Sequence, residues 1–483
     1  MREKKVIEID KFNNFNNSSS NIKAKSFYNF FPTQTLHNSK GITVATFPLN
    51  LTDKTESELN IVGAGLESVD GVAYFKQYVQ RTGKTVHRLL VYGGDKKVYI
   101  NQMMDDTYDL FWLYNLTFNS APIVLSYKKD DKDAIILASE DSMKVWKTEN
   151  SPYTISDVPI ITSMCMHEGV LFCTIVDPAF KLWYATELDA ENVGNISTTS
   201  GYVSLEDDLG YARKILVFNE DVYVFRDYGI SKINYVKKDI TASQVYLSNT
   251  KIYTNTVSVC GNSILFMTKD GLYSFNGIKV SKTNVELLNS FNFENDGAVA
   301  SSLGEKYYLA LRLNFEDEKQ VLCEEEEYIN NALLVVDTCD YSYEIIRGVD
   351  IKSLLAVKTD MFEKMLIVFN SAHKDKIGQI VDSSICFDVA LPKFWESDSV
   401  VDNFSTKLFT KLMVKADAGV KFALKYDDKI MSFTTYNSGI NEFIFRVCCK
   451  DLKLEISSEN ESAIVKNVIL EYYEYWFCRF EKI

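Results

Sequence analysis

The feature that most constrains this chain is a short design that recurs between residues 133 and 275. Each copy has an apolar strand, a tight polar turn and a second strand that carries an aromatic or large apolar residue. The first strands begin at Ala134, Val170, Asp221 and Ser263, and the second strands begin at Met143, Lys181, Ile230 and Gly271. One such unit cannot bury its apolar face alone, so neighbouring copies must stack. The pattern predicts an all-β fold, and specifically a β-propeller.

The repeat continues on both sides of these four copies. A hairpin over residues 72–100 precedes them, and two further units begin near Lys306 and Lys364. Seven equivalent points from Leu89 to Met365 have a mean spacing of about 46 residues, which lies within the ~40–50 residues of a four-stranded propeller blade. Because the spacing is uneven, the sequence predicts six or seven blades, with seven favoured.

The chain divides into three parts. Residues 1–70 are predicted to be an extended N-terminal arm with lead-in strands, since the first 25 residues are polar and include an Asn- and Ser-rich run. Residues 71–400 carry the repeat and form the propeller. Residues 401–483 contain six short alternating strands with regular turns, which indicate a small C-terminal β-sandwich.

Composition excludes several classes of protein. The chain has 52 basic and 66 acidic residues, so its formal net charge of −14 argues against a general basic surface for nucleic acid. The same net charge is compatible with a negatively charged channel surface past which DNA moves without binding. The nine Cys are odd in number and contain no CxxC motif, which indicates reduced thiols made in a cytosol. No apolar run approaches the ~18 residues of a membrane span, so none is expected.

The residue types that carry catalysis do not gather in recognisable motifs. The four His residues stand apart, at positions 37, 87, 167 and 373, and no nucleophile elbow or phosphate-binding loop is present. Most carboxylates fall in turns, such as Asp130-Asp131, Glu206-Asp207-Asp208 and Asp270, where we expect them to be solvated. The sequence therefore predicts no catalytic residue, no metal site and no cofactor, and the chain is not expected to be an enzyme.

Three stretches are predicted to contact other molecules instead. The first is the apolar end of the arm, where Tyr28, Phe30 and Phe31 follow the polar run. The polar segment is either a frayed terminus or an arm that orders against a neighbouring subunit, and the arm is favoured. The second is an acidic insertion within a blade. It is either a solvated hairpin tip or a surface that repels DNA phosphates or binds a basic partner. The third is an apolar tail, as either a last core strand or a docking peptide. The residues of the insertion and the tail are Glu324, Glu325, Glu326, Glu327, Trp476 and Phe477.

The layout resembles the β-propeller tail and head-completion proteins of tailed bacteriophages, including the nozzle or "stabilisation" proteins of short-tailed phages. The resemblance lies in the arm leading to residues 29–42, in the paired strands at 306–311 and 331–337, and in the C-terminal strand phrasing at 407–414, 443–447 and 452–472. It covers nearly the whole chain, but it rests on the order and residue pattern of the strands and not on invariant residues.

Such a resemblance implies a virion structural protein of the neck or tail, made in the host bacterial cytoplasm. It would form a homo-oligomeric ring, with a hexamer favoured, below the portal. The ring would extend the channel for double-stranded DNA without sequence-specific binding, and would attach a portal or adaptor and other tail proteins.

Two other classes of function fit the same architecture. A carbohydrate-binding or carbohydrate-cleaving propeller, at a tail tip or in a cell, would need aromatic side chains and carboxylates clustered on one face. An intracellular scaffold of the WD-repeat kind would show the GH…WD spacing, which this sequence lacks.

Overall fold

The fold was analysed in a computed structural model that describes residues 4–12, 24–48, 56–59, 61, 65–79, 83–101, 110–129, 132–147, 151–236, 239–285, 295–315, 328–359, 362–400 and 405–474. Secondary structure in these ranges consists of β-strands and one short 3-10 helix, Glu187–Asn192. No helix among them is long and apolar enough to cross a membrane. The all-β prediction is confirmed.

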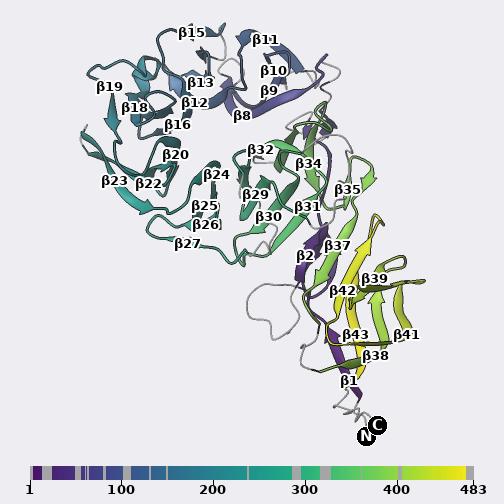
Figure 1. Ribbon diagram of the computed structural model, residues 1–483. Helices are drawn as coiled ribbons and strands as arrows, with labels where there is room; N and C mark the ends of the chain where they lie inside the picture. Colours follow the sequence, from purple (N-terminus) through teal and green to yellow (C-terminus); the bar gives the residue numbers. More distant parts are fainter. Residues whose placement is uncertain are drawn as a thin grey trace, which may run out of the picture.

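Seven sheets, antiparallel apart from one short parallel contact in the seventh, follow one another along the chain and are arranged in a ring (Figure 1). Six of them are built from four consecutive strands each, in the simple order of a meander. The first three sheets are β8 (Val69–Val79), β9 (Lys84–Gly93), β10 (Lys97–Asn101) and β11 (Leu110–Thr117); β12 (Ile123–Lys129), β13 (Lys132–Ala138), β14 (Met143–Trp146) and β15 (Tyr153–Ile155); and β16 (Ile161–His167), β17 (Val170–Ile175), β18 (Lys181–Thr186) and β19 (Ser200–Ser204).

The next three sheets repeat the same order. They are β20 (Ala212–Phe218), β21 (Asp221–Arg226), β22 (Gly229–Val236) and β23 (Asp239–Leu247); β24 (Ile252–Cys260), β25 (Ser263–Thr268), β26 (Gly271–Phe275) and β27 (Val280–Lys282); and β28 (Val299–Leu303), β29 (Lys306–Leu311), β30 (Ala332–Asp337) and β31 (Tyr343–Arg347). The alternation of apolar strands and polar turns in the sequence corresponds directly to these hairpins.

The seventh sheet takes its fourth strand from the other end of the chain. Strands β32 (Ile351–Lys358), β33 (Glu363–Phe369) and β34 (Ile377–Val381) are completed by β5 (Gly41–Val44), which pairs antiparallel with β34. Two short strands, β35 (Ile385–Cys386) and β36 (Val389–Ala390), extend the sheet beyond β5. After β5, a small hairpin of β6 (Thr46–Pro48) and β7 (Glu56–Glu58) precedes β8. The sequence assigned residues 41–44 to the lead-in, whereas they close the ring.

The ring is closed by packing as well as by pairing. The first strand of each sheet contacts the first strand of the next, and β32 contacts β8, which returns the ring to its start. Apolar clusters fill the spaces between adjacent sheets, including one in which Val357 and Leu366 of the seventh sheet pack with Leu89 and Val91 of the first. First strands that converge on a centre, with later strands outside, define a β-propeller.

The sandwich consists of two sheets and contains the first and the last described strands of the chain (Figure 1). In one sheet the order is β3 (Phe30–Pro32), β4 (Leu36–Asn38), β43 (Val465–Glu474), β38 (Lys407–Ala416) and β41 (Gly439–Cys449), and β1 (Lys4–Ile9) also pairs with β43. In the other sheet the order is β2 (Ala24–Tyr28), β37 (Lys393–Ser397), β42 (Lys453–Ser458), β39 (Lys421–Tyr426) and β40 (Lys429–Thr434).

This topology corrects two sequence-based predictions. The sandwich is not confined to residues 401–483, because β1 to β4 and β37 also belong to its sheets. The described part of the arm is not free to order on a neighbouring subunit either, since β1 pairs with β43 and β2 pairs with β37 of the same chain. Residues 4–9 were not recognised as a strand from the sequence, because polar side chains occupy its exposed face.

Ring and sandwich meet at the sixth sheet, where β2 and β3 contact β31. Asn29, between β2 and β3, is fully buried and has a φ of 55°. Its backbone N–H donates to the carbonyl of Ile345 at 2.7 Å, and its side-chain oxygen accepts from the N–H of Arg347 at 2.8 Å. Its amide nitrogen donates to the carbonyls of Arg347 and Pro392 at 3.3 and 2.7 Å. One residue thus ties the outer strand of the sixth sheet to the start of β37.

Candidate functional site

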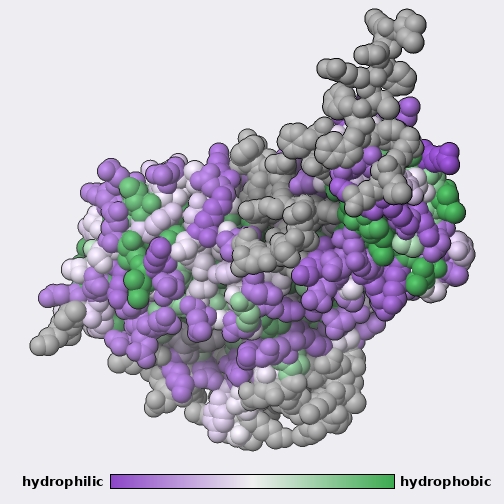
Figure 2. Space-filling model, turned by 90° about the horizontal axis from the view of Figure 1, so that it is seen from below, coloured by the Kyte–Doolittle hydropathy of each residue, from purple (hydrophilic) through white to green (hydrophobic). Residues whose placement is uncertain are grey.

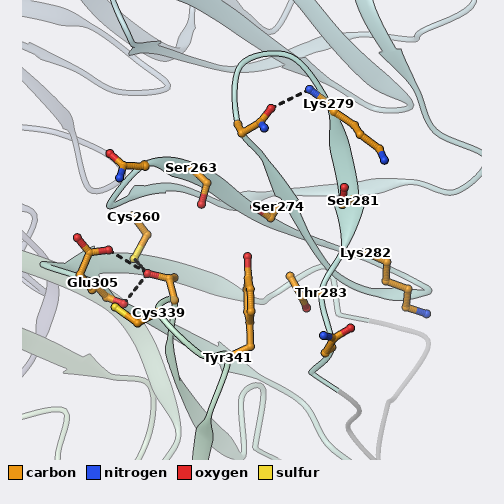
Figure 3. Close-up of a pocket in the computed structure, with 14 residues that line it drawn as sticks. Cys260, Ser263, Ser274, Lys279, Ser281, Lys282, Thr283, Glu305, Cys339 and Tyr341 are labelled. Carbon is orange, nitrogen blue, oxygen red and sulfur yellow. Dashed lines mark hydrogen bonds between the residues drawn. The ribbon is translucent and has the colours of Figure 1, made fainter. Parts of the chain in front are cut away.

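A cavity of about 620 Å³ opens between the fifth and sixth sheets of the ring (Figure 3). Its volume lies in the range of small-molecule sites, roughly 300–1,000 Å³. Its lining is polar, with hydroxyl, amide and amine groups and a single aromatic ring. The lining residues are Cys260, Asn262, Ser263, Ser274, Asn276, Lys279, Ser281, Lys282, Thr283, Asn284, Glu305, Thr338, Cys339 and Tyr341.

Hairpin turns place most of these side chains. The β24–β25, β28–β29 and β30–β31 turns lie on one side of the cavity, and the β26–β27 hairpin lies on the other (Figure 3). The first two turns use Gly261 and Gly304 at φ values of 53° and 60°, a conformation that glycine adopts without steric cost. Sequence alternation fixes these turns, and the stacking of two sheets brings them together.

The polar groups of the turns largely satisfy one another. The Thr338 hydroxyl donates to the Glu305 carbonyl at 2.8 Å and lies 3.1 Å from a Glu305 carboxylate oxygen. The Asn276 side-chain oxygen accepts from the backbone N–H groups of Ile278 and Lys279 at 3.0 and 2.8 Å. These bonds rigidify the walls. The hydroxyls of Ser274 and Ser281 and the amines of Lys279 and Lys282 also line the cavity.

The two thiols of the cavity are not activated nucleophiles. Burial raises the pKa of Cys260, and a hydrogen bond with Asp337 together with that residue's charge raises the pKa of Cys339. Since the thiolate is the reactive form, a raised pKa leaves both thiols protonated at neutral pH. Glu305 is the one carboxylate among the lining residues, whereas acid–base glycoside hydrolysis uses a pair. The arrangement can hold a polar ligand by hydrogen bonds but does not assemble a catalytic set.

The aromatic residues predicted at the end of the arm lie inside the molecule. Tyr28 and Phe30 are buried, and Phe31 is half-buried. The ring of Tyr28 stacks on Phe394 with centroids 5.3 Å apart, and the guanidinium of Arg347 lies 4.6 Å from its centroid. Tyr28 and Phe30 therefore join the parts of one chain, which corrects their predicted role as a contact for a neighbouring subunit. The apolar run indicated a contact, but the sequence did not show that the contact lies within the same chain.

The other predicted interaction residues, Glu324, Glu325, Glu326, Glu327, Trp476 and Phe477, lie outside the described residues. Within the described ranges, no group of three or more His, Cys, Asp or Glu side chains could hold a metal ion.

The sequence predicted that the carboxylates in turns are solvated. One of them has a buried partner instead. Asp207 forms an ion pair at 2.6 Å with Arg226, whose side chain is fully buried. The same guanidinium donates to the carbonyls of Leu205 and Gly210 at 2.5 Å. A buried guanidinium needs such partners, so this cluster is structural and holds the 205–210 turn against β21.

The sequence did not point to the cavity between the fifth and sixth sheets. Its lining comes from four separate turns and contains ordinary turn residues, without a motif or fixed spacing. The only available signal was that these turns are polar.

Neither a protein-family model nor a curated protein sequence matches this chain. Solved structures with a similar fold include BBS1N in complex with ARL6DN, with 11% identity and a TM-score of 0.40 over 65% of this chain and 92% of that chain. Kluyveromyces lactis Hsv2 has 9% identity and a TM-score of 0.34 over 64% and 98%. The N-terminal domain of Nup159 has 9% identity and a TM-score of 0.36 over 71% and 95%. At these TM-scores, the assignment of the fold rests on the strand topology described above.

Proposed function

We propose that this chain is a structural subunit of a bacteriophage neck or tail, a ring-forming nozzle or head-completion protein. In this proposal each of the seven sheets is one blade of the propeller, and the sandwich is a second binding platform held at a fixed angle to it. The neighbours would be further copies of the chain, with a hexamer favoured, together with a portal or adaptor and other tail proteins. Double-stranded DNA would pass without sequence-specific contacts.

The observation that carries this proposal is the way the two parts are locked together. Asn29 is bonded to the sixth sheet and to Pro392, and the arm strands β1 and β2 are built into the sandwich. A protein that transmits position between neighbours needs such rigidity, whereas an enzyme needs a set of reactive groups, and the cavity assembles none. The resemblance in strand phrasing to phage tail proteins supplies the biological setting.

Assembly of the purified full chain tests the proposal. We expect light scattering and electron microscopy to show closed rings, either of the chain alone or after addition of the portal from the same virus. The chain should also be found by mass spectrometry in purified particles. A chain that stays monomeric under both conditions and is missing from particles would contradict the proposal.

Carbohydrate binding is the second candidate, and the polar cavity between the fifth and sixth sheets favours it. Hydroxyl, amide and amine groups beside one tyrosine suit a sugar, while the single carboxylate narrows this alternative to binding. Titration with host-surface polysaccharide fragments tests it. We expect Lys282→Ala to weaken such binding if it occurs, whereas Lys429→Ala, an exposed lysine of the sandwich, should leave it unchanged.

A further inference from the structure

An unpaired strand at the edge of the sandwich is the surface we consider. β41 has 11 residues and pairs with β38 on one side, and no described strand pairs with its other side. A long edge strand of this kind exposes a row of backbone N–H and C=O groups to which another strand can add. Native proteins commonly protect such edges with prolines, bulges or inward-pointing charges. β41 contains no proline, and its one irregularity lies at Phe445 and Arg446, where the register against β38 shifts.

The side chains of β41 make this edge apolar as well as open. Ile440 and Ile444 project from its outer face and are 67% and 84% exposed. Hydrophobic side chains gather over this side of the sandwich, on the right in Figure 2, where Figure 1 places β41. Exposed apolar patches of this kind mark interaction sites.

The core is also incompletely covered at this edge. Phe443, on the inner face of β41, is only half-buried, and so is Phe433 on β40, which lies across from it with ring centroids 5.0 Å apart. A strand added beside β41 would bring its own inner-face side chains next to the Phe443 ring.

We propose that β41 binds the C-terminal segment 475–483 of a second copy of this chain as an added antiparallel strand. The segment reads Tyr-Trp-Phe-Cys-Arg-Phe-Glu-Lys-Ile and lies outside the described residues. This inference rests on the proposed function, because it supplies the contact between subunits of the ring.

Charge and apolar pattern select one register for the added strand. When Arg479 is placed beside Glu442, antiparallel pairing puts Phe477 beside Ile444 and Tyr475 beside Arg446. Glu442 already pairs with Lys411 of β38 at 2.9 Å, so Arg479 would join this ion pair from the other side. The outer face would also carry an apolar pair and a cation beside an aromatic ring, and contacts of these kinds stabilise paired strands. On the inner face, Trp476 falls beside Phe445, where it extends the core. A parallel strand that keeps Arg479 beside Glu442 would instead place Glu481 beside Ile444.

The position at which the described chain ends favours a second copy over the same copy. Glu474 pairs with Lys407 of β38, and Lys407 pairs with Cys449 of β41. The space outside β41 is therefore three strand spacings, roughly 14 Å, from the end of β43. Because a residue spans at most about 3.6 Å, about four residues would be needed for the crossing. Trp476 and Phe477 would then lie in the crossing, and Phe477 could not reach Ile444.

Such a contact joins different surfaces of the two copies. The tail of one copy binds the edge strand of the next, so the arrangement is head-to-tail. Repetition of a head-to-tail contact generates a ring when the rotation closes. The proposed contact thus has the symmetry that a ring requires, and every subunit offers one tail and one edge.

The test compares the mass of the full chain with that of three variants, by light scattering at matched concentrations. Ending the chain at Glu474 removes the tail, and Ile444→Lys places a charge on the outer face of β41. Ile278→Lys is the matched control, since Ile278 is 87% exposed on the propeller. We expect the first two variants to be monomeric and the control to assemble like the full chain. Retention of the assembled mass by either of the first two variants would overturn the inference.

A second measurement separates this inference from the proposed function. Residues 475–483 are fused to a small monomeric carrier and titrated against the chain that ends at Glu474. We expect binding that Ile444→Lys weakens by at least about tenfold and that Ile278→Lys leaves unchanged. Absence of binding, or equal binding to both variants, overturns the tail contact even when the full chain forms rings. Binding without rings would support the tail contact and would count against the proposed function instead. Circular dichroism verifies that each variant is folded.

Discussion

Asn29 shows at the residue scale how the ring and the sandwich are joined. Its side chain bonds to Arg347 and Pro392, and it is fully buried. In Asn29→Ala, three backbone groups would lose their partners, and each such loss costs about 1–3 kcal/mol. We expect the free energy of unfolding to fall by at least about 3 kcal/mol, and urea denaturation should resolve separate transitions for the ring and the sandwich.

Asn219→Ala is the matched control for this prediction. Asn219 has a φ of 48° but lies exposed in a turn of the fourth sheet. It isolates the cost of placing alanine in the left-handed region, about 1 kcal/mol. Equal destabilisation by the two substitutions would show that the side-chain bonds of Asn29 contribute little.

Lys393 gives a second residue-scale prediction, a dependence of stability on pH. Burial lowers its pKa from 10.5 to about 8, and its amine donates to the carbonyls of Leu391 and Asn460 at 3.2 and 2.5 Å. Between these two pKa values the unfolded chain binds more protons than the folded one, so this residue's contribution to stability rises with pH. We expect the wild type to gain up to about 3 kcal/mol relative to Lys393→Met between pH 8 and 10.5. Parallel pH profiles of the two proteins would contradict this.

For single residues, the side-chain chemistry predicted the kind of contact but not the partner. The apolar character of Tyr28 indicated contact, but its partners, Arg347 and Phe394, lie more than 300 residues away in the sequence. Nothing local to Asn29 distinguished it from the other asparagines. Long-range partners determine the role of a residue of this kind, and they are set by the packing of whole sheets.

At the scale of elements, hairpins were predictable and strand exchanges were not. Alternation and turn residues determine which strands pair locally, as for β21 and β22, which the sequence indicated directly. The pairing of β5 with β34 joins residues 41–44 to residues 378–381. No local pattern specifies such a partner, because any strand with the right alternation fits the open edge of a sheet.

Gly41 provides a test of this closure. A Cβ atom at Gly41 would lie 2.1 Å from the carbonyl oxygen of Ser383 and 2.2 Å from that of Ile385. Both are backbone atoms that cannot move away alone, so Gly41→Ala must displace β5 from the seventh sheet. We expect a loss of about 3 kcal/mol or more in the free energy of unfolding, and faster hydrogen exchange in β34.

The matched substitution for this test is Gly297→Ala. There the added Cβ would meet only a methyl group of Ile329, a half-exposed side chain that can move. We expect little change in stability and in exchange. Similar losses of stability at both glycines would mean that the closing strand does not contribute specifically to the stability of the ring.

At the scale of the whole molecule, the sequence predicted the architecture but misplaced its boundaries. The repeat indicated a propeller because every unit carries the same pattern, and six strands after residue 400 indicated the sandwich. The sandwich also takes in residues 4–9 and 24–38, since apolar faces that far apart in sequence can share one core. The polar cavity lies between two sheets, so no single segment encoded it.

The distribution of charge over the whole molecule leads to the last prediction. The net charge is −14, yet the first strands of the sheets, which converge on the centre of the ring, carry more basic than acidic residues. The basic ones are Lys76, Lys128, Lys129, Arg213, Lys214, Lys352 and Lys358, against Asp70. Several are already neutralised, as in the Lys352–Asp70 pair at 2.7 Å and the Arg213–Asp227 pair at 3.0 Å. The acidic balance therefore does not describe the centre of the ring.

Lys352, Arg213 and Lys358 already form ion pairs, which reduces the number of cations that can contact phosphates, so we expect no retained complex with double-stranded DNA at physiological ionic strength. A gel-shift titration measures this directly, and Lys352→Ala should not alter the result. A shift that weakens steeply with added salt and is reduced by Arg213→Ala with Lys214→Ala would contradict the expectation. It would make the centre of the ring a DNA-binding surface rather than a passage.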